Sequence, residues 1–198
     1  MDAVRKTLAL DIGGVCIRLR PQRVFEALEF PPNTPLPADA LSLIDDYNCG
    51  RVGNHQFAEG LRSITGKNLS DSQMEQIWNL FLDAEIPTTT QFLQELWRRG
   101  WRIIWFSDTQ PWHLDCLRKY VSYADEIPEG IYSFEVGAQK PSPLMYEAFE
   151  RRFGKPSLYL DDRLNNIQGG IACGWNSVLY QETEELPALC KRLLMTIT

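Results

Sequence analysis

Short apolar runs recur along the chain and are separated by longer amphipathic segments. Such runs are typical of the buried strands of a parallel sheet, because helices cover both faces of such a sheet. They predict strands at Lys6–Leu10, Arg102–Phe106, Ser157–Leu160 and Asn176–Tyr180. A weaker run, Ile131–Phe134, predicts an edge strand.

The segments between most of these runs carry apolar residues at helical spacing. In Gln91–Arg99, Phe92 and Leu96 fall on one stripe, and Gly100 follows as a stop signal. The same spacing predicts helices at Trp112–Tyr120, Leu144–Phe153 and Leu164–Cys173. Alternating strands and helices predict an α/β fold, a doubly wound parallel sheet with a Rossmann-like core.

One long segment, from about residue 20 to residue 87, breaks this alternation and contains no convincing strand. Its apolar spacing predicts helices at Arg23–Glu29, Ala38–Tyr47, His55–Ile64 and Asp71–Leu82. Asn54 and Ser70 stand where N-caps are expected. We therefore expect residues 1–18 and 88–198 to form the α/β core and residues 19–87 to form an inserted all-helical cap.

Length and charge narrow the classes of function. The chain has 198 residues, which suits one domain with a small insert, and a formal net charge of −6. We expect no nucleic-acid partner, because binding a phosphate backbone requires a face rich in Lys and Arg. We expect no membrane partner, because no stretch approaches the roughly 20 apolar residues of a membrane helix. The first apolar run ends at Asp11 without a signal-peptide core, which favours a cytoplasmic protein, and no pattern indicates an oligomeric state.

Nitrogen and sulfur ligands for a metal are sparse, whereas carboxylates gather at the ends of predicted strands. The five cysteines are scattered, and neither they nor the two histidines show zinc-site spacing. Asp11 ends the first strand, and Asp161 and Asp162 follow the strand at 157–160. The carboxyl ends of parallel strands meet at one edge of a sheet, where three carboxylates repel one another unless a cation lies among them. Hard oxygen ligands of this kind suit Mg²⁺.

Three further polar residues lie at the same edge, and two of them suit a phosphate group. Ser107 and Asp108 end the strand at 102–106, and Lys140 opens the helix before the strand at 157–160. Each alone has a simpler interpretation, since a strand-end Asp often caps the next helix and a lone Lys is usually a solvated charge. A lysine and a hydroxyl beside a cation, however, suit a phosphoryl group. Together these residues predict a small phosphorylated substrate.

The order of these features resembles the haloacid dehalogenase (HAD) superfamily, in particular its sugar-phosphatase-like members with a helical cap, the glucose-1-phosphatase-like subgroup. Leu10–Val15 is similar to the first motif of that family, and Ser107–Thr109 to the second. Lys140, within Gln139–Pro143, matches the third motif. Tyr159–Asp162, followed by Asn165–Ile167, matches the fourth, so the resemblance covers nearly the whole chain.

The resemblance implies a Mg²⁺-dependent phosphatase that hydrolyses a small phosphorylated metabolite, above all a sugar phosphate. Asp11 would be the nucleophile and form an aspartyl phosphate. Mg²⁺ would be held by Asp11, the backbone carbonyl of Gly13 and Asp162, with Asp161 and Asn166 one shell further out. The phosphate would be bound by Ser107, Asp108 and Lys140.

Two positions depart from the family pattern. Gly13 stands where the family usually has a second Asp as general acid and base, which contributes roughly 10²–10⁴-fold to the rate. Asp108 stands where Asn is common, and an extra carboxylate would weaken binding of a phosphate dianion unless it points away. His113 is a candidate replacement for the missing acid, or else a surface residue. Arg51 is a candidate for gripping an anionic substrate, or else a solvated arginine.

Two alternatives to a phosphatase remain open. A metal-free 2-haloacid dehalogenase also lacks the second Asp of the first motif, but dehalogenases of that type lack the acid pair found here at Asp161 and Asp162. A degenerate phosphatase fold that serves as a binding or regulatory module is the other alternative. Gly13 and Asp108 are the residues that favour it.

Overall fold

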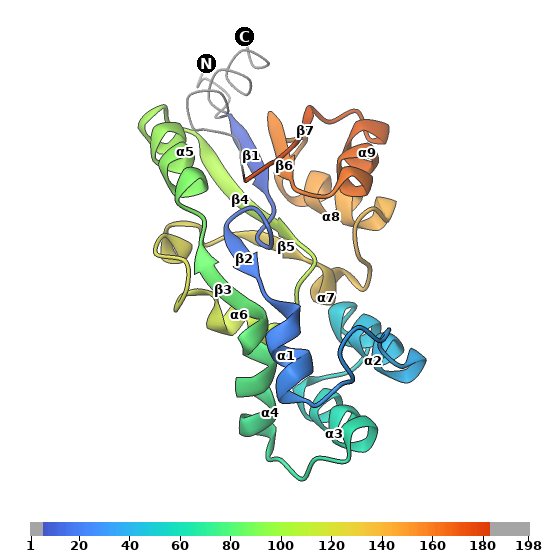
Figure 1. The fold of residues 1–198 in the computed structure, drawn as a ribbon. Coiled ribbons are helices and arrows are strands. Elements are labelled where there is room, and N and C mark those ends of the chain that lie inside the picture. Colours follow the sequence, from blue (N-terminus) through green and yellow to red (C-terminus); the bar gives the residue numbers. More distant parts are fainter. Residues whose placement is uncertain (1–5, 183–198) are drawn as a thin grey trace.

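A parallel sheet forms the centre of the molecule (Figure 1). The structure is a computed structural model, and it describes residues 6–182. Over that range the sheet has five strands, in the order β5 (Gly130–Tyr132), β4 (Arg102–Ser107), β1 (Thr7–Leu10), β6 (Leu158–Asp161) and β7 (Ser177–Leu179). All four strand pairs are parallel, which confirms the predicted α/β class, and β5 lies at an edge as expected.

Helices cover both faces of this sheet. They are α5 (Pro87–Arg98), α6 (Pro111–Leu117), α7 (Ser133–Val136), α8 (Pro143–Phe153) and α9 (Leu164–Ala172), with a 3₁₀ turn, η2 (Ala124–Glu126). Successive residues of β1 belong to different hydrophobic clusters: Leu8 and Leu10 pack with α5 and α6, whereas Ala9 packs with α8 and α9. This alternation is what the pleat of a strand buried on both faces requires.

The strand register brings the three polar strand ends together. In the central strand Leu10 lies beside Trp105 of β4 on one side and Leu160 of β6 on the other. The backbone N–H of Asp11 donates to the carbonyl of Leu160 at 3.0 Å. The residues that follow these three strands therefore share one edge of the sheet, as the sequence predicts.

The segment between β1 and α5 is mainly helical. It contains α1 (Pro21–Ala27), α2 (Ala38–Asn48), α3 (Asn54–Thr65), α4 (Asp71–Trp78) and a 3₁₀ turn, η1 (Asn79–Phe81). These helices have their own hydrophobic cluster, to which Trp112 of α6 also contributes. Ser70 caps α4 as predicted, accepting from the N–H of Gln73 at 3.3 Å, but the N-cap of α3 is Gly53 and not Asn54.

The prediction that residues 20–87 hold no strand is wrong. β3 (Leu82–Glu85) pairs antiparallel with β2 (Ile17–Leu19) in a two-stranded ribbon, so the inserted segment is not all helical. Acidic residues and Ala are poor strand formers, and pairing with β2 overrides that local preference. Asp83 of β3 is also held by ion pairs with Arg20 and Arg23. The division into a core of 1–18 and 88–198 and a cap of 19–87 stays a prediction.

Two further observations bear on the class of protein. Among residues 6–182, no helix combines the length and the apolar character needed to cross a membrane. Four of the five cysteines carry free thiols: Cys16, Cys49, Cys116 and Cys173. Cys190 lies outside the described residues.

Candidate active site

Lys140 lies at the centre of the site and joins the ends of three strands. Its Nζ donates three hydrogen bonds, to Asp11 Oδ1 at 2.9 Å, to Asp161 Oδ2 at 2.7 Å and to the carbonyl oxygen of Phe106 at 2.8 Å. An ammonium has three protons, so this side chain is fully satisfied. Only 1% of the side chain is exposed, and Lys140 is therefore a buried cation and not a solvated charge.

Asp161 is buried and saturated with hydrogen bonds. Besides Lys140, it accepts from the Tyr159 hydroxyl at 2.6 Å, from the N–H of Arg163 at 2.8 Å, and from the Asn166 amide at 3.1 Å. Burial disfavours its charge, but Lys140 and these donors outweigh burial and hold the pKa of Asp161 below its usual value. Few lone pairs remain for a metal, so Asp161 and Asn166 act as supports for Lys140.

Asp162 occupies a different position, at the surface of the crevice. Asp162 is exposed, and its carboxylate lies against the turn that contains Gly13 and Gly14. Gly14 has φ +72°, and a Cβ there would overlap the Asp162 carboxylate, so both the conformation and the space require glycine. Asp162 is thus held beside the backbone of the first motif.

The carboxylate oxygens of Asp11, Asp161 and Asp162 fit a divalent cation. One oxygen from each lies within 4.8 Å of the others. Burial, with Asp161 and Asp162 nearby, raises the pKa of Asp11 to about 7 although Lys140 opposes this. Burial and then Asp161 also raise the pKa of Asp162. Three carboxylates therefore face one lysine, and this excess of negative charge is what a hard cation would neutralise.

Ser107 and Asp108 line the crevice at the end of β4. Together with Gly13 they line a narrow pocket of about 50 Å³. Asp108 Oδ1 accepts from the backbone N–H of Lys140 at 2.9 Å, which fixes the Lys140 segment to β4. Ser133 holds the next residue, accepting from the N–H of Thr109 at 2.9 Å and donating to its carbonyl at 3.0 Å. Burial raises the pKa of Asp108.

A larger pocket, of about 280 Å³, adjoins this crevice between the helical segment and the core. We call it the cap–core pocket. Its apolar walls are Leu19, Phe25, Ile44, Trp78 and Phe81. Its polar residues are Asn48, Asp108, Gln110, His113, Gln139 and Arg163. Most of these residues carry no charge, so the pocket suits a small uncharged group.

His113 lines the cap–core pocket, but its imidazole packs against Phe81 and is hydrogen-bonded to the backbone of Trp78. It is buried and stacks on Phe81, with ring centroids 5.2 Å apart, and its Nε2 lies 3.2 Å from the carbonyl of Trp78. A carbonyl accepts only, so Nε2 carries the proton. Burial lowers the pKa of His113 to about 4. His113 is therefore a neutral residue that joins α6 to the helical segment, which argues against its interpretation as the missing acid.

Arg51 is held by acids of its own neighbourhood and is not in the lining of the cap–core pocket. Its guanidinium pairs with Asp46 at 2.5 Å and with Asp45, both on α2. The side chains that α2 brings to the core are instead Asp45 and Asn48. Asp45 accepts from the Gln139 amide at 2.7 Å, and Asn48 donates to Gln139 at 3.3 Å. The sequence analysis missed Gln139 and Asn48, although the position of Gln139 next to Lys140 was an available signal.

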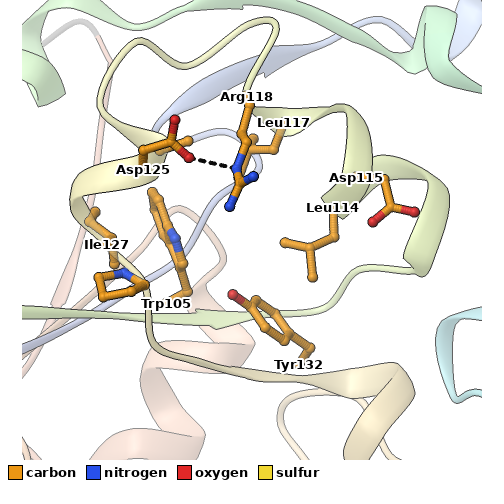
Figure 2. A pocket seen from close by; sticks show the side chains of 10 residues that line it. Trp105, Leu114, Asp115, Leu117, Arg118, Asp125, Ile127 and Tyr132 are labelled. Carbon is orange, nitrogen blue, oxygen red and sulfur yellow. Dashed lines mark ion pairs between the residues drawn. The ribbon is translucent and has the colours of Figure 1, made fainter.

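Another pocket, of about 370 Å³, shares Leu114 and Leu117 with the narrow pocket and is lined by the side chains drawn in Figure 2. Trp105, Tyr132 and side chains of α6 form its walls, and Arg118 pairs with Asp125 at its rim at 2.6 Å. Its lining, drawn from the described residues, includes none of the predicted site residues. The cap–core pocket, which adjoins Asp108, is therefore the candidate substrate pocket.

Solved structures with the same fold are HAD proteins, whereas no family model matches the sequence. A HAD family enzyme from Bacteroides thetaiotaomicron has a TM-score of 0.80 and 22% identity, over 93% of this chain and 98% of that chain. The same enzyme in complex with magnesium and inorganic phosphate has a TM-score of 0.77. A HAD-like family hydrolase from Porphyromonas gingivalis has a TM-score of 0.77 and 22% identity, over 97% of this chain and 98% of that chain.

A dehalogenase is also similar, at a lower level. L-2-haloacid dehalogenase from Xanthobacter autotrophicus, with chloropropionic acid covalently bound, has a TM-score of 0.62 and 19% identity. The match covers 97% of this chain and 83% of that chain. At these identities the likeness concerns the fold, and this chain has the α/β fold of HAD proteins.

Proposed function

We propose that this protein is a HAD-superfamily phosphatase that hydrolyses a small phosphorylated metabolite in the cytoplasm, with Mg²⁺ and an aspartyl-phosphate intermediate. The single observation that carries the proposal is the Lys140 ammonium, buried between Asp11 and Asp161 beside a third carboxylate, Asp162. A lysine held against a nucleophilic carboxylate suits a ligand with more negative charge than a carboxylate, as a phosphate monoester has.

In this mechanism Asp11 attacks the phosphorus atom in line with the departing alcohol. Lys140, kept in place by Asp161 and the Phe106 carbonyl, compensates the charge of the phosphoryl oxygens as they shift in the transition state. The Ser107 hydroxyl would bind another of these oxygens. Water then attacks the phosphorus of the aspartyl phosphate and regenerates the Asp11 carboxylate.

Asp11, Asp162 and the carbonyl of Gly13 would hold the Mg²⁺ ion. The ion would neutralise charge on the phosphate and on the crowded carboxylates. The position of Asp162 against the Gly13–Gly14 turn supports this ligand set. The hydrogen bonds that saturate Asp161 support its place one shell further out.

The cap–core pocket supports a sugar-sized, uncharged alcohol as the leaving group. Its volume of about 280 Å³ suits a small ligand, and its amides at Asn48, Gln110 and Gln139 are partners for hydroxyl groups. Phe81 and Trp78 offer flat apolar surface to the carbon face of such a ring. These features favour a sugar phosphate and the sugar-phosphatase-like subgroup.

A phosphate-release screen over phosphorylated metabolites, with Mg²⁺ and with excess chelator, tests the proposal. We expect release that requires Mg²⁺ and is lost in Asp11→Asn, but is kept in Asp115→Asn, a matched change at an exposed position of α6. Chloride release from 2-chloropropionate without metal would favour the dehalogenase alternative instead. Binding of Mg²⁺ with no turnover of any substrate would favour the degenerate binding module.

A further inference from the structure

Cleavage of a phosphate ester from an alcohol needs a proton donor, because an alkoxide is a poor leaving group. Position 13 has no side chain to supply one. Of the described residues that line the cap–core pocket, Asp108, His113 and Arg163 are ionisable. A guanidinium does not release its proton near neutral pH, and His113 is buried as the neutral imidazole, so Asp108 remains.

The geometry of Asp108 suits a donor to the leaving group. It directly follows Ser107 and lines both the narrow pocket that contains Gly13 and the cap–core pocket. Its Oδ1 is fixed by the Lys140 N–H at 2.9 Å. Within residues 6–182 the Asp108 carboxyl group makes no other hydrogen bond, so its Oδ2 remains for a substrate. The carboxyl group thus lies at the boundary between the phosphate site and the leaving-group pocket.

The charges around Asp108 are compatible with a protonated carboxyl group. Burial is the largest influence and raises its pKa, and Asp161 adds to this, whereas Lys140 and Arg163 oppose it. The nearby His113 carries no charge. A phosphate dianion bound beside Ser107 would favour the protonated form further, because two adjacent negative charges repel.

We propose that Asp108 is the catalytic acid and base of this site and takes over the work of the side chain missing at Gly13. This inference rests on the proposed phosphatase function. As the bond from phosphorus to the leaving oxygen breaks, its electron pair goes to that oxygen, which takes the Asp108 proton and leaves as an alcohol. The products of this step are the Asp11 phosphate and the Asp108 carboxylate.

The second step restores both residues. The Asp108 carboxylate takes a proton from water as the water oxygen bonds to phosphorus. The bond from phosphorus to the Asp11 oxygen breaks, and its electron pair returns to the Asp11 carboxylate. Hydrogen phosphate leaves and Asp108 is again protonated. The two departures from the family pattern, a missing acid at position 13 and an added one at position 108, thus compensate each other.

Asp108→Asn tests the proposal, because the amide oxygen still accepts the Lys140 N–H while the acidic proton is lost. An alkyl phosphate needs protonation of its leaving group, whereas 4-nitrophenyl phosphate does not. We expect kcat/KM for the alkyl phosphate to fall by about 10²-fold or more, and that for the aryl phosphate to fall by only a few-fold. Asp115→Asn should change neither. Equal losses for both substrates, or no loss, would overturn the assignment.

Moving the acid back to position 13 gives a rescue test. A Cβ at Gly13 would approach Leu19 Cδ1 at 2.9 Å, and Leu19 is 36% exposed, so this flexible side chain has room to shift. Gly13→Asp combined with Asp108→Asn should recover alkyl phosphatase activity relative to Asp108→Asn alone. Rescue without a change in the ratio of aryl to alkyl kcat/KM would show that Asp108 has a structural role only.

A third measurement needs neither turnover nor metal. In protein labelled with ¹³C at aspartate carboxyl carbons, the resonance that Asp108→Asn removes should titrate above the usual range of Asp, and higher still with inorganic phosphate present. Titration of this resonance in the usual range would exclude Asp108 as the acid, whatever the kinetics of the variants. Failure of the proposed phosphatase function is distinguishable, because the wild-type protein would then hydrolyse neither ester.

Discussion

Lys140 Nζ lies 2.7 Å from Asp161 Oδ2, with 1% of the lysine side chain and none of the aspartate side chain exposed. Each of these two buried charges is stabilised by the other. Removing one of them leaves an uncompensated charge in the interior, which is strongly destabilising. Asp161 also accepts hydrogen bonds from Tyr159 and Asn166, so its loss would leave these donors without their partner.

Asp161→Ala should therefore destabilise the protein, by about 3–5 kcal/mol in the free energy of unfolding. Urea denaturation in excess chelator measures this without a contribution from Mg²⁺. Asp161→Asn serves as the milder comparison, because it keeps the shape and one of the two acceptor oxygens. An Asp161→Ala protein as stable as the wild type would mean that the network around Lys140 is not a structural element.

Asp162→Ala should instead leave the free energy of unfolding nearly unchanged and raise the Mg²⁺ requirement. Its carboxylate is exposed and has a raised pKa, so its removal in chelator should change the free energy of unfolding by less than about 1 kcal/mol. The Mg²⁺ concentration needed for half-maximal activity should rise far more than in Asp161→Asn. Similar Mg²⁺ requirements in the two variants would undo the assignment of Asp162 as the direct ligand.

The pKa of Asp11 predicts that the effect of Mg²⁺ on stability depends on pH. Burial raises this pKa from 3.8 to about 7, so between these values the folded protein holds a proton that the unfolded chain has lost. In the metal-free protein the contribution of Asp11 to stability should therefore fall as pH rises from about 4 to about 7, by as much as roughly 4 kcal/mol. Asp108 and Asp162, whose pKa values are also raised, act in the same direction.

Because Mg²⁺ binds the ionised carboxylate, it should raise the Tm more at pH 8 than at pH 5. Thermal denaturation at both pH values, with Mg²⁺ and with chelator, measures the difference. Asp11→Asn should reduce it, since the amide does not ionise. An Mg²⁺ effect that is equal at pH 5 and pH 8 in the wild-type protein would contradict the raised pKa.

His113 predicts an acid-sensitive contact between α6 and the helical segment. Burial lowers its pKa from 6.5 to about 4. Between these pH values His113 is therefore protonated in the unfolded chain and neutral in the folded protein. The contribution of His113 to stability should fall as pH falls from 6.5 to 4, by up to about 3 kcal/mol, and it opposes the contribution of Asp11 over the same range. His113→Gln keeps an N–H for the Trp78 carbonyl and should remove the His113 contribution, so that the variant gains stability relative to the wild type as pH falls from 6.5 to 4. An unchanged profile in urea denaturation would rule His113 out as its cause.

Much of the core was predictable because its signals are local. Short apolar runs fixed the positions of β1, β4 and β6, and the polar residues after them had to share one sheet edge. Asp11, Asp161, Asp162 and Lys140 meet there as expected. The supporting role of Asp161 became visible only with its hydrogen-bond partners, Tyr159 and Asn166.

The features that sequence reasoning missed depend on long-range pairing. β3 has few strand-forming residues and exists because it pairs with β2. The two strands are more than 60 positions apart in the chain, and no local pattern records a pairing over such a separation. Arg51 was a candidate for substrate binding until Asp45 and Asp46 were seen to pair with it. The sequence leaves His113 open as a candidate acid or a surface residue. The surface interpretation is wrong, because rings from η1 and α4 bury His113.

The most direct test of the account is to look for the phosphoryl group on Asp11. Enzyme quenched during turnover with Mg²⁺ and substrate is treated with borohydride, which reduces an acyl phosphate to an alcohol, and is then mapped by peptide mass spectrometry. We predict reduction at Asp11, absent when substrate is omitted, when Mg²⁺ is chelated, and in Asp11→Asn. Phosphate release by an enzyme whose Asp11 is never modified would contradict the account.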